Sequence, residues 1–216
     1  MADNPGLSPD VRQRYESMYT GVFYKRYILG QWCVAEGLVY SFDPEKHLTD
    51  SPPQTGRYFI SVDYGTLNPF SAGLWCVGQG RAVRLREYYH DGRKTGQTLT
   101  DEEYYRQIEN LAGDLPVEQV IVDPSAASFI AVIRRHRRFS VRKAKNSVLD
   151  GIRRVSSCLQ AGNLQFSPVC RDTIREFGLY RWEDGGSQDK PVKEHDHAMD
   201  DIRYFCATVL RRGTER

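Results

Sequence analysis

The chain has 216 residues, enough for one domain with a substantial hydrophobic core and an additional segment. Its 30 basic and 28 acidic residues nearly cancel, so the net charge of +2 favours no class of partner by itself. The five cysteines show no CxxC spacing and are odd in number, which argues against a disulfide framework or a zinc site and indicates reduced thiols in a cytosol. With no signal peptide and no long apolar run, the sequence predicts a soluble protein that is neither secreted nor membrane-bound.

The first part of the chain, residues 1–56, is irregular and rich in aromatic side chains. Ser8-Pro9-Asp10 combines a capping residue with proline at the first helical position, which predicts a short helix. Apolar residues in the second half are too frequent for a free linker, so we expect this segment to pack on the following domain or on a neighbouring part of a longer protein. Ser51-Pro52-Pro53 marks the boundary. The chain thus divides into a linker segment, residues 1–56, and a folded domain, residues 57–216.

Three strands are expected at the start of the domain. Residues 57–63 form a buried apolar run that ends in Asp63. Residues 70–78 and 82–89 are also apolar, and the short glycine-containing turn between them predicts an antiparallel hairpin. The polar stretch 90–99 predicts a loop.

Helices and strands alternate in the rest of the domain. Thr100 and Glu103 form a capping box, which predicts a helix to about Ala112. Residues 117–123 predict a strand that again ends in an aspartate, Asp123. The other expected elements are helices over residues 127–133, 147–161 and 169–180, short strands at residues 139–141 and 164–166, and a final helix after a polar loop at residues 183–194.

This order of elements predicts an α/β fold with a mixed central sheet, in which three antiparallel strands are followed by parallel strands and helices flank the sheet. Sites in such folds lie at the carboxyl ends of the strands. Asp63 and Asp123 both end strands, so their carboxylates lie side by side if those strands are parallel neighbours. The alternative is structural, because aspartate is common in the turns that end strands.

The final helix begins in a stretch crowded with acids and histidines. Apolar residues from Met199 onward have helical spacing. If the helix packs on the same edge of the sheet, Asp200 joins the two strand-end carboxylates. Three carboxylates suit Mg²⁺ or Mn²⁺, which prefer oxygen ligands, and two such ions can activate water and stabilise a leaving oxygen in phosphodiester cleavage. Acids at a helix start also interact favourably with the helix dipole, which is the structural alternative.

Four motifs, taken together in their order, resemble one protein family. They read Ile-Ser-Val-Asp-Tyr-Gly at 60–65, Ile-Val-Asp-Pro-Ser-Ala-Ala at 121–127, Ala-Lys-Asn-Ser-Val-Leu-Asp-Gly-Ile at 144–152, and Asp-His-Ala-Met-Asp-Asp-Ile-Arg-Tyr at 196–204. Their residues and their order along the chain resemble the carboxy-terminal nuclease domain of the large terminase subunit of tailed bacteriophages, which has an RNase H-like fold. The lead-in at residues 23–32 and 36–40 resembles the segment that links the packaging ATPase to this nuclease, so the resemblance covers nearly the whole chain.

The resemblance implies roles for individual residues. Asp63, Asp123 and Asp200 match the metal-binding aspartates of the family, and His197 matches a histidine near the metals. Asp201 is a rival ligand and a departure, since family members often carry alanine there. Adjacent helical residues point about 100° apart, so only one of the pair is expected to ligate fully. Asp200 is favoured, because Met199 and Ile202 define the buried side of the helix and the family register agrees.

Other polar residues near these positions are expected to be structural. Asp196 is well placed to cap the final helix. Asp150 and Glu176 lie on predicted helices, where ordinary salt bridges are expected. His195 is expected to be a solvent-exposed loop residue, and His197 has a structural alternative as a cap.

The implied function is that of a metal-dependent endonuclease that cuts concatemeric double-stranded DNA, uses two Mg²⁺ or Mn²⁺ ions and works in the cytoplasm of the bacterial host. The implied partners are DNA, the terminase ATPase domain, the small terminase subunit and the portal protein. No GxxxxGK[ST] phosphate loop occurs in the sequence, so we expect no ATP hydrolysis by this chain. Two alternatives stay open: another RNase H-like nuclease of the resolvase or integrase type, or a non-catalytic module that binds DNA or docks on the capsid.

One region of the domain is strongly basic. As a hypothesis it lines the DNA path, because neutralising phosphates supplies most sequence-independent affinity, and replacing Arg137 and Arg138 by alanine should then flatten the salt dependence of DNA binding. The alternative is a solvated helix end, where cations suit the dipole. Arg93 and Lys94 are a second candidate contact. The basic residues of the region are Arg134, Arg135, Arg137, Arg138, Arg142, Lys143 and Lys145.

Overall fold

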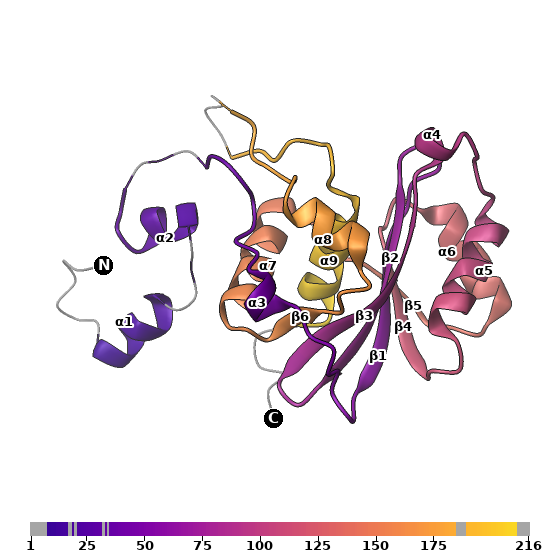
Figure 1. Cartoon of the computed structure of the whole chain (residues 1–216), viewed down its shortest axis with the longest axis horizontal. Helices are drawn as coiled ribbons and strands as arrows, with labels where there is room; N and C mark the ends of the chain where they lie inside the picture. Colours follow the sequence, from indigo (N-terminus) through magenta and orange to yellow (C-terminus); the bar gives the residue numbers. More distant parts are fainter. Residues whose placement is uncertain are drawn as a thin grey trace.

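The computed structural model describes residues 8–16, 19, 21–31, 33, 35–184 and 189–210. A six-stranded sheet runs through the middle of the domain, with helices on both faces (Figure 1). No helix among the described residues is long and apolar enough to span a bilayer.

The sheet is mixed, as the sequence predicts. Its strands are β1 (Arg57–Asp63), β2 (Phe70–Gly78), β3 (Arg81–His90), β4 (Val117–Val122), β5 (Val141–Lys143) and β6 (Leu164–Phe166). The order across the sheet is β5-β4-β1-β2-β3-β6. β2 is antiparallel to both β1 and β3, whereas β4 is parallel to β1, β5 to β4 and β6 to β3. The carboxyl ends of β1, β4 and β5 therefore lie at the same end of the sheet. We call this end, where these strands finish, the site edge.

The helices form two layers. One face of the sheet is covered by α5 (Asp101–Ala112) and α6 (Ala127–His136), and the other by α7 (Val148–Gln160), α8 (Arg171–Phe177) and α9 (His197–Thr208) (Figure 1). In β1, Ile60 and Val62 join the core under α5 and α6, while Phe59 joins the core under α9. This alternation follows from the strand, because successive side chains point to opposite faces.

α9 lies against the sheet at the centre of its layer. Met199, Ile202 and Cys206 are fully buried, which confirms the buried side predicted from their spacing. The ring of Phe205 stacks on Trp75 of β2 with centroids 4.1 Å apart. The helix start that carries the acids is therefore held at a fixed place on the sheet.

Two elements differ in extent from their predictions. β5 occupies residues 141–143 and not 139–141, because Arg137 ends α6 with a positive φ of 57° and Phe139 is buried in the core. α8 is shorter than the predicted helix over residues 169–180, since its chain leaves the helix at Gly178.

The predicted loop 90–99 contains a short helix, α4 (Gly92–Thr95). The Asp91 side chain accepts the backbone N–H groups of Arg93 and Lys94, both at 3.1 Å, which starts the helical turn. Because β3 runs toward the site edge, α4 and its two cations lie at that edge as well.

The described part of residues 1–56 contacts the layer of α7, α8 and α9. Phe23 meets Trp182 edge-on with centroids 6.3 Å apart, and Phe42 stacks on Phe177 at 4.4 Å. Aromatic side chains thus attach this segment to the domain. Its helices are α1 (Pro9–Glu16), which starts at the predicted proline, α2 (Gly21–Tyr27) and α3 (Pro44–His47).

Candidate active site

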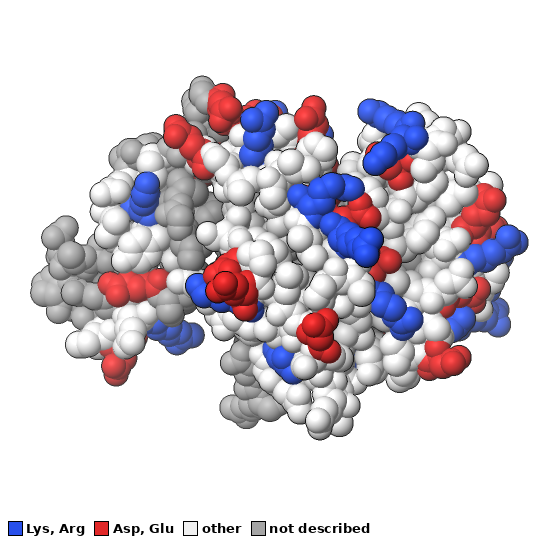
Figure 2. All heavy atoms as spheres, viewed as in Figure 1, with Lys and Arg blue, Asp and Glu red and all other residues white. Residues whose placement is uncertain are grey.

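Two of the predicted carboxylates come together at the site edge. β1 and β4 are parallel neighbours in which Val62 pairs with Val122. Asp63 and Asp123 are the next residues along each segment, so they lie beside one another at the carboxyl ends of the strands. Figure 2 shows the surface indented at this edge, between α4 and the loop that leads into α9. The aspartates therefore lie where a ligand can approach from solvent.

One helix supplies a partner to each of three aspartates. The contacts join His197 Nδ1 to Asp63 Oδ2 at 3.0 Å, the Tyr204 hydroxyl to Asp123 Oδ2 at 2.6 Å, and Nε and Nη2 of Arg203 to Asp200 Oδ1 at 3.0 and 2.9 Å. Helical residues three or four apart share a face, and these positions recur at that spacing. A single face of α9 therefore carries the third carboxylate and the partners of the other two.

Burial dominates the electrostatics at Asp63. It raises the pKa of Asp63 to about 7, which the hydrogen bond with His197 opposes and the charge of Asp200 reinforces. Burial alone would lower the pKa of His197, but its contacts with Asp63 and Asp196 outweigh burial and raise that pKa. Burial also raises the pKa of Asp200, against the opposing effect of Arg203. Asp63 and Asp200 thus resist being charged together.

Asp123 has a different environment. Burial alone would raise its pKa, but hydrogen bonds from Ser125 and Tyr204 outweigh burial and lower the pKa of Asp123. The Ser125 backbone N–H donates to Oδ1 at 2.7 Å, and the Tyr204 hydroxyl donates to Oδ2. Hydrogen bonds to the charged form therefore keep this carboxylate ionised.

Asp201 lies in the interior of the protein. Its Oδ1 accepts from the Ser61 hydroxyl at 3.0 Å and from Arg84 Nη1, and its Oδ2 accepts from the Ser71 hydroxyl and from Arg84 Nη2 at 3.0 Å. A carboxylate offers about four lone-pair sites, so these bonds leave none for a metal. Asp201 is fully buried, whereas the Asp200 side chain is 23% exposed. Of the two rivals, Asp200 is the one that a ligand can reach.

The start of α9 is capped from another helix. Asp196 stands at the N-cap position but with helical backbone angles, and its side chain accepts no capping hydrogen bond from the described residues; its Oδ1 lies 3.6 Å from His197 Nε2. Glu176 of α8 instead accepts the Ala198 N–H at 2.7 Å and the Tyr89 hydroxyl at 2.6 Å. The predicted cap by the Asp196 side chain is therefore wrong. Glu176 forms the predicted ion pair, with Arg175 at 3.7 Å, in addition to capping α9.

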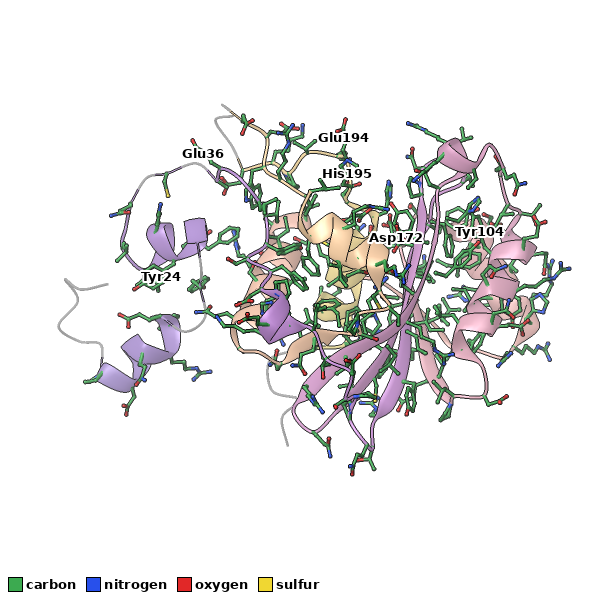
Figure 3. All side chains as sticks on the ribbon, viewed as in Figure 1. Tyr24, Glu36, Tyr104, Asp172, Glu194 and His195 are labelled. Atoms are coloured by element: carbon green, nitrogen blue, oxygen red, sulfur yellow. The ribbon has the colours of Figure 1, made fainter. Side chains whose placement is uncertain are left out.

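Two further predictions agree with the structure. Asp150 forms an exposed ion pair with Arg153 at 3.0 Å. His195 is exposed and lies with Glu194 in the loop that leads into α9 (Figure 3).

The basic residues expected to contact DNA form two groups, one away from the site edge and one beside it. α6 starts just after Asp123 and runs away from the site edge. Arg138 at its far end donates to the Gly113 carbonyl at 2.6 Å, ahead of β4, and Arg135 pairs with Glu102. Arg138 therefore lies at the end of the sheet opposite the aspartates, and the other arginines of this group lie along or just after the last turn of α6, away from the aspartates.

The remaining basic residues follow β5 toward the site edge. Lys143 pairs with Val122 in the sheet register, and Lys145 comes two residues later; both side chains are exposed. Arg142 is half-buried and donates to Gln119 at 3.5 Å. Lys143 and Lys145 are thus the members of the predicted basic region that adjoin the site.

Three residues of the site were not predicted as part of it. Tyr204 and Arg203 lie four and three positions after Asp200, and that helical spacing is the signal that could have identified them. Glu176 carries no such signal, because it caps α9 from a separate helix.

The oxygen donors fit a hard divalent cation. Among the hydrogen bonds of the described residues, none reaches Oδ1 of Asp63 or Oδ2 of Asp200, and each oxygen of Asp123 accepts one. Mg²⁺ and Mn²⁺ prefer such carboxylate ligands. Within the described part of the chain, no three acidic, histidine or cysteine side chains form a closed metal cluster. Coordination by all three aspartates therefore requires side-chain adjustment around the ion.

The sheet topology, with strand-end aspartates on β1 and β4 and a helix crossing them, defines an RNase H-like domain. A large terminase from a thermophilic bacteriophage, solved in complex with ADP, is 44% identical with a TM-score of 0.91, over 97% of this chain and 54% of that one. The large terminase subunit of Escherichia phage T5 is 26% identical over 229 residues, 97% of this chain and 50% of that protein. The chain is similar to large terminase subunits over nearly its whole length, and it spans about half the length of these relatives. No family model matches it.

Isolated nuclease domains share the fold. The nuclease domain of the P22 large terminase has a TM-score of 0.64 at 17% identity, over 79% of this chain and 91% of that domain. The large terminase nuclease of thermophilic phage G20c, solved with bound magnesium, has a TM-score of 0.54 at 13% identity, over 73% of this chain and 84% of that one. This chain therefore has the fold of isolated terminase nuclease domains.

Proposed function

We propose that this chain is a metal-dependent endonuclease of a phage terminase that cuts concatemeric double-stranded DNA during packaging. The observation that carries the proposal is the placement of Asp63, Asp123 and Asp200, from two strands and one helix, at one accessible sheet edge. The family relationship and the nuclease-domain fold support the same activity.

The proposed cofactors are two Mg²⁺ or Mn²⁺ ions held by Asp63, Asp123 and Asp200. When bound, such ions activate water and stabilise the leaving oxygen in phosphodiester hydrolysis. The choice of ion is supported by the oxygen donors and by the magnesium bound to the similar nuclease domain of phage G20c.

The protein's own residues prepare the carboxylates. His197 hydrogen-bonds to Oδ2 of Asp63, so Oδ1 stays available to a metal. Arg203 donates to Oδ1 of Asp200, so Oδ2 stays available. The side chains of Asp63 and Asp200 are 15% and 23% exposed, so a DNA phosphate can approach them from the indented surface. The arrangement combines fixed carboxylates with access for a backbone phosphate.

The proposed partners follow from the family. Double-stranded DNA is the substrate. The ATPase part of a large terminase, the small terminase subunit and the portal protein are the proposed assembly partners in the host cytoplasm. None of these contacts involves a membrane.

A plasmid nicking assay with Mn²⁺ tests the activity. Wild-type protein should convert supercoiled plasmid to nicked and linear forms, and Asp63→Ala should abolish cleavage. Asp150→Ala is the matched control, because Asp150 makes exposed contacts with Arg153 and the Ser147 hydroxyl, and it should retain wild-type activity. Absence of metal-dependent cleavage by wild type would leave a non-catalytic binding module. Strong preference for four-way junctions over plasmid would indicate a resolvase.

A further inference from the structure

Building on the proposed function, we propose that Tyr204 is a positioning residue that fixes the Asp123 carboxylate for metal binding. Tyr204 is 4% exposed and donates its hydroxyl proton to Asp123 Oδ2 at 2.6 Å. Hydrogen bonds to a charged acceptor are shorter and stronger than neutral ones. The contact joins residues 81 positions apart in the chain and ties the end of β4 to α9.

Asp123 needs such a contact because its other constraint is local. It follows the last residue of β4, and its Oδ1 accepts the N–H of Ser125 two residues later, an interaction typical of a turn. This bond alone fixes the side chain only relative to its own loop. The Tyr204 hydroxyl adds the second point, which sets the plane of the carboxylate relative to the rest of the site. Each oxygen keeps a lone pair for a metal.

Arg203, which pairs with Asp200, also contacts the Tyr204 ring. The Arg203 guanidinium lies over the Tyr204 ring, 4.7 Å from its centroid, and its Nη1 donates to the Asn146 carbonyl at 2.7 Å. The same guanidinium pairs with Asp200. The successive residues Arg203 and Tyr204 therefore fix the second and third carboxylates relative to one another.

The variant Tyr204→Phe removes only the hydroxyl and retains the buried ring. We expect it to weaken Mn²⁺ binding to the intact chain by about 10- to 100-fold, the range found when outer partners of metal ligands are removed. Titration calorimetry measures this without relying on cleavage. Affinity equal to that of wild type would overturn the positioning role.

Tyr104→Phe is the matched control. Tyr104 is also fully buried, but its hydroxyl has no hydrogen-bond partner among the described residues, and it lies on α5, across the sheet from α9 (Figure 3). This control should bind Mn²⁺ as wild type does. An equal loss in both variants would mean that any buried tyrosine hydroxyl affects the site through stability, which would reject the specific role of Tyr204.

A second measurement separates this inference from the nuclease proposal. In EDTA, the melting temperatures of Tyr204→Phe, Asp123→Asn and the double variant test whether the two side chains are coupled without metal. The double variant should lose less than the sum of the single losses, and additive losses would overturn the contact. If coupling is present but wild type neither binds Mn²⁺ nor cuts DNA, the proposed function fails while the Tyr204–Asp123 link stands.

Discussion

Asp63 is the residue at which the demands of folding and of chemistry conflict most directly. Burial raises its pKa to about 7, and the nearby charges of Asp200 and Asp201 act in the same direction, while His197 acts against them. A folded protein without metal must therefore hold a carboxyl that is about half protonated at pH 7. A bound cation would favour the ionised form, because an adjacent positive charge stabilises it.

The stability of the metal-free protein should consequently depend on the protonation of Asp63. Its pKa is raised from 3.8 in the reference state to about 7 in the fold, so the folded protein binds more protons than the unfolded chain between these values. The free energy of unfolding should then fall as the pH rises from about 4 to about 7. Asp63→Asn should reduce this slope and increase stability at neutral pH.

Urea denaturation in EDTA across this pH range measures the effect. Asp150→Asn serves as the control, since Asp150 lies in an exposed ion pair, and it should keep the wild-type slope. An Asp63→Asn protein with the full wild-type slope would show that other carboxyls, such as Asp200 or Glu176, account for the pH dependence.

Individual site residues can be predicted from the sequence where their position at the end of a strand marks them. They cannot be predicted where their role depends on a contact with a residue far away in the chain. Asp63 and Asp123 are identifiable because strands end there and parallel strand ends share an edge. The choice of Asp200 over Asp201 follows from the buried side that Met199 and Ile202 define and from the family register. The buried partner of Asp201 is Arg84, which lies 117 residues away and has no local pattern that marks it as internal.

Among the elements, α9 is the one whose placement decides the geometry of the site. Asp201 anchors it through a fully buried ion pair with Arg84. The neighbouring strand leaves room for this arginine only because residue 73 is glycine, where a Cβ would lie 2.1 Å from Arg84 Nη1. Next to the ion pair, the Trp75 indole donates to the Ser61 hydroxyl at 2.8 Å. These contacts fix α9 one residue away from Asp200.

Removal of this anchor should be costly. Asp201→Ala leaves the buried Arg84 charge without its two-point partner and with only Glu87, 3.7 Å away. Breaking a buried ion pair from one side typically costs about 3–5 kcal/mol of folding free energy. Asp172→Ala breaks an ion pair with Arg175 whose side chains are 33% and 42% exposed, and it should cost only about 0–1 kcal/mol. Chemical denaturation in EDTA compares the two. Equal costs would mean that the buried pair does not stabilise the packing of α9.

Local patterns also predict most of the elements, but not how they pair. The capping box of α5 and the β2–β3 hairpin have their signals within a few residues, and both are present. The parallel pairing of β6 with β3 joins segments about 80 residues apart, and nothing in either short segment specifies it. The late start of β5 depends on the positive φ of Arg137 and the burial of Phe139, which are set by packing on α5 and the sheet.

At the scale of the whole molecule, the net charge is nearly zero, but the basic side chains are unevenly distributed between the site edge and the rest of the domain. The site edge carries Arg93 and Lys94 on α4, Lys143 at the end of β5 and Lys145 just after it, and all four side chains are exposed. Figure 2 shows basic side chains over α4, beside the indented surface. The arginines at the end of α6 lie away from the site edge, and two of them pair with acids of α5. DNA that reaches the aspartates should therefore contact the first group.

Salt dependence of DNA binding distinguishes the two groups with the same number of charges removed. The double variant Lys143→Ala/Lys145→Ala should weaken binding and reduce the slope of log K against log salt by up to about 2, because each phosphate contact contributes about 0.9. Arg134→Ala/Arg137→Ala removes two exposed cations at the end of α6, which have no acidic partner among the described residues, and it should leave the slope unchanged. Fluorescence anisotropy with a labelled duplex in EDTA measures binding without cleavage. A reduced slope in the arginine variant alone would contradict this assignment. It would place the DNA along α6, as the hypothesis of a path over Arg137 and Arg138 requires, and the DNA would then have to extend from the end of α6 to Asp63.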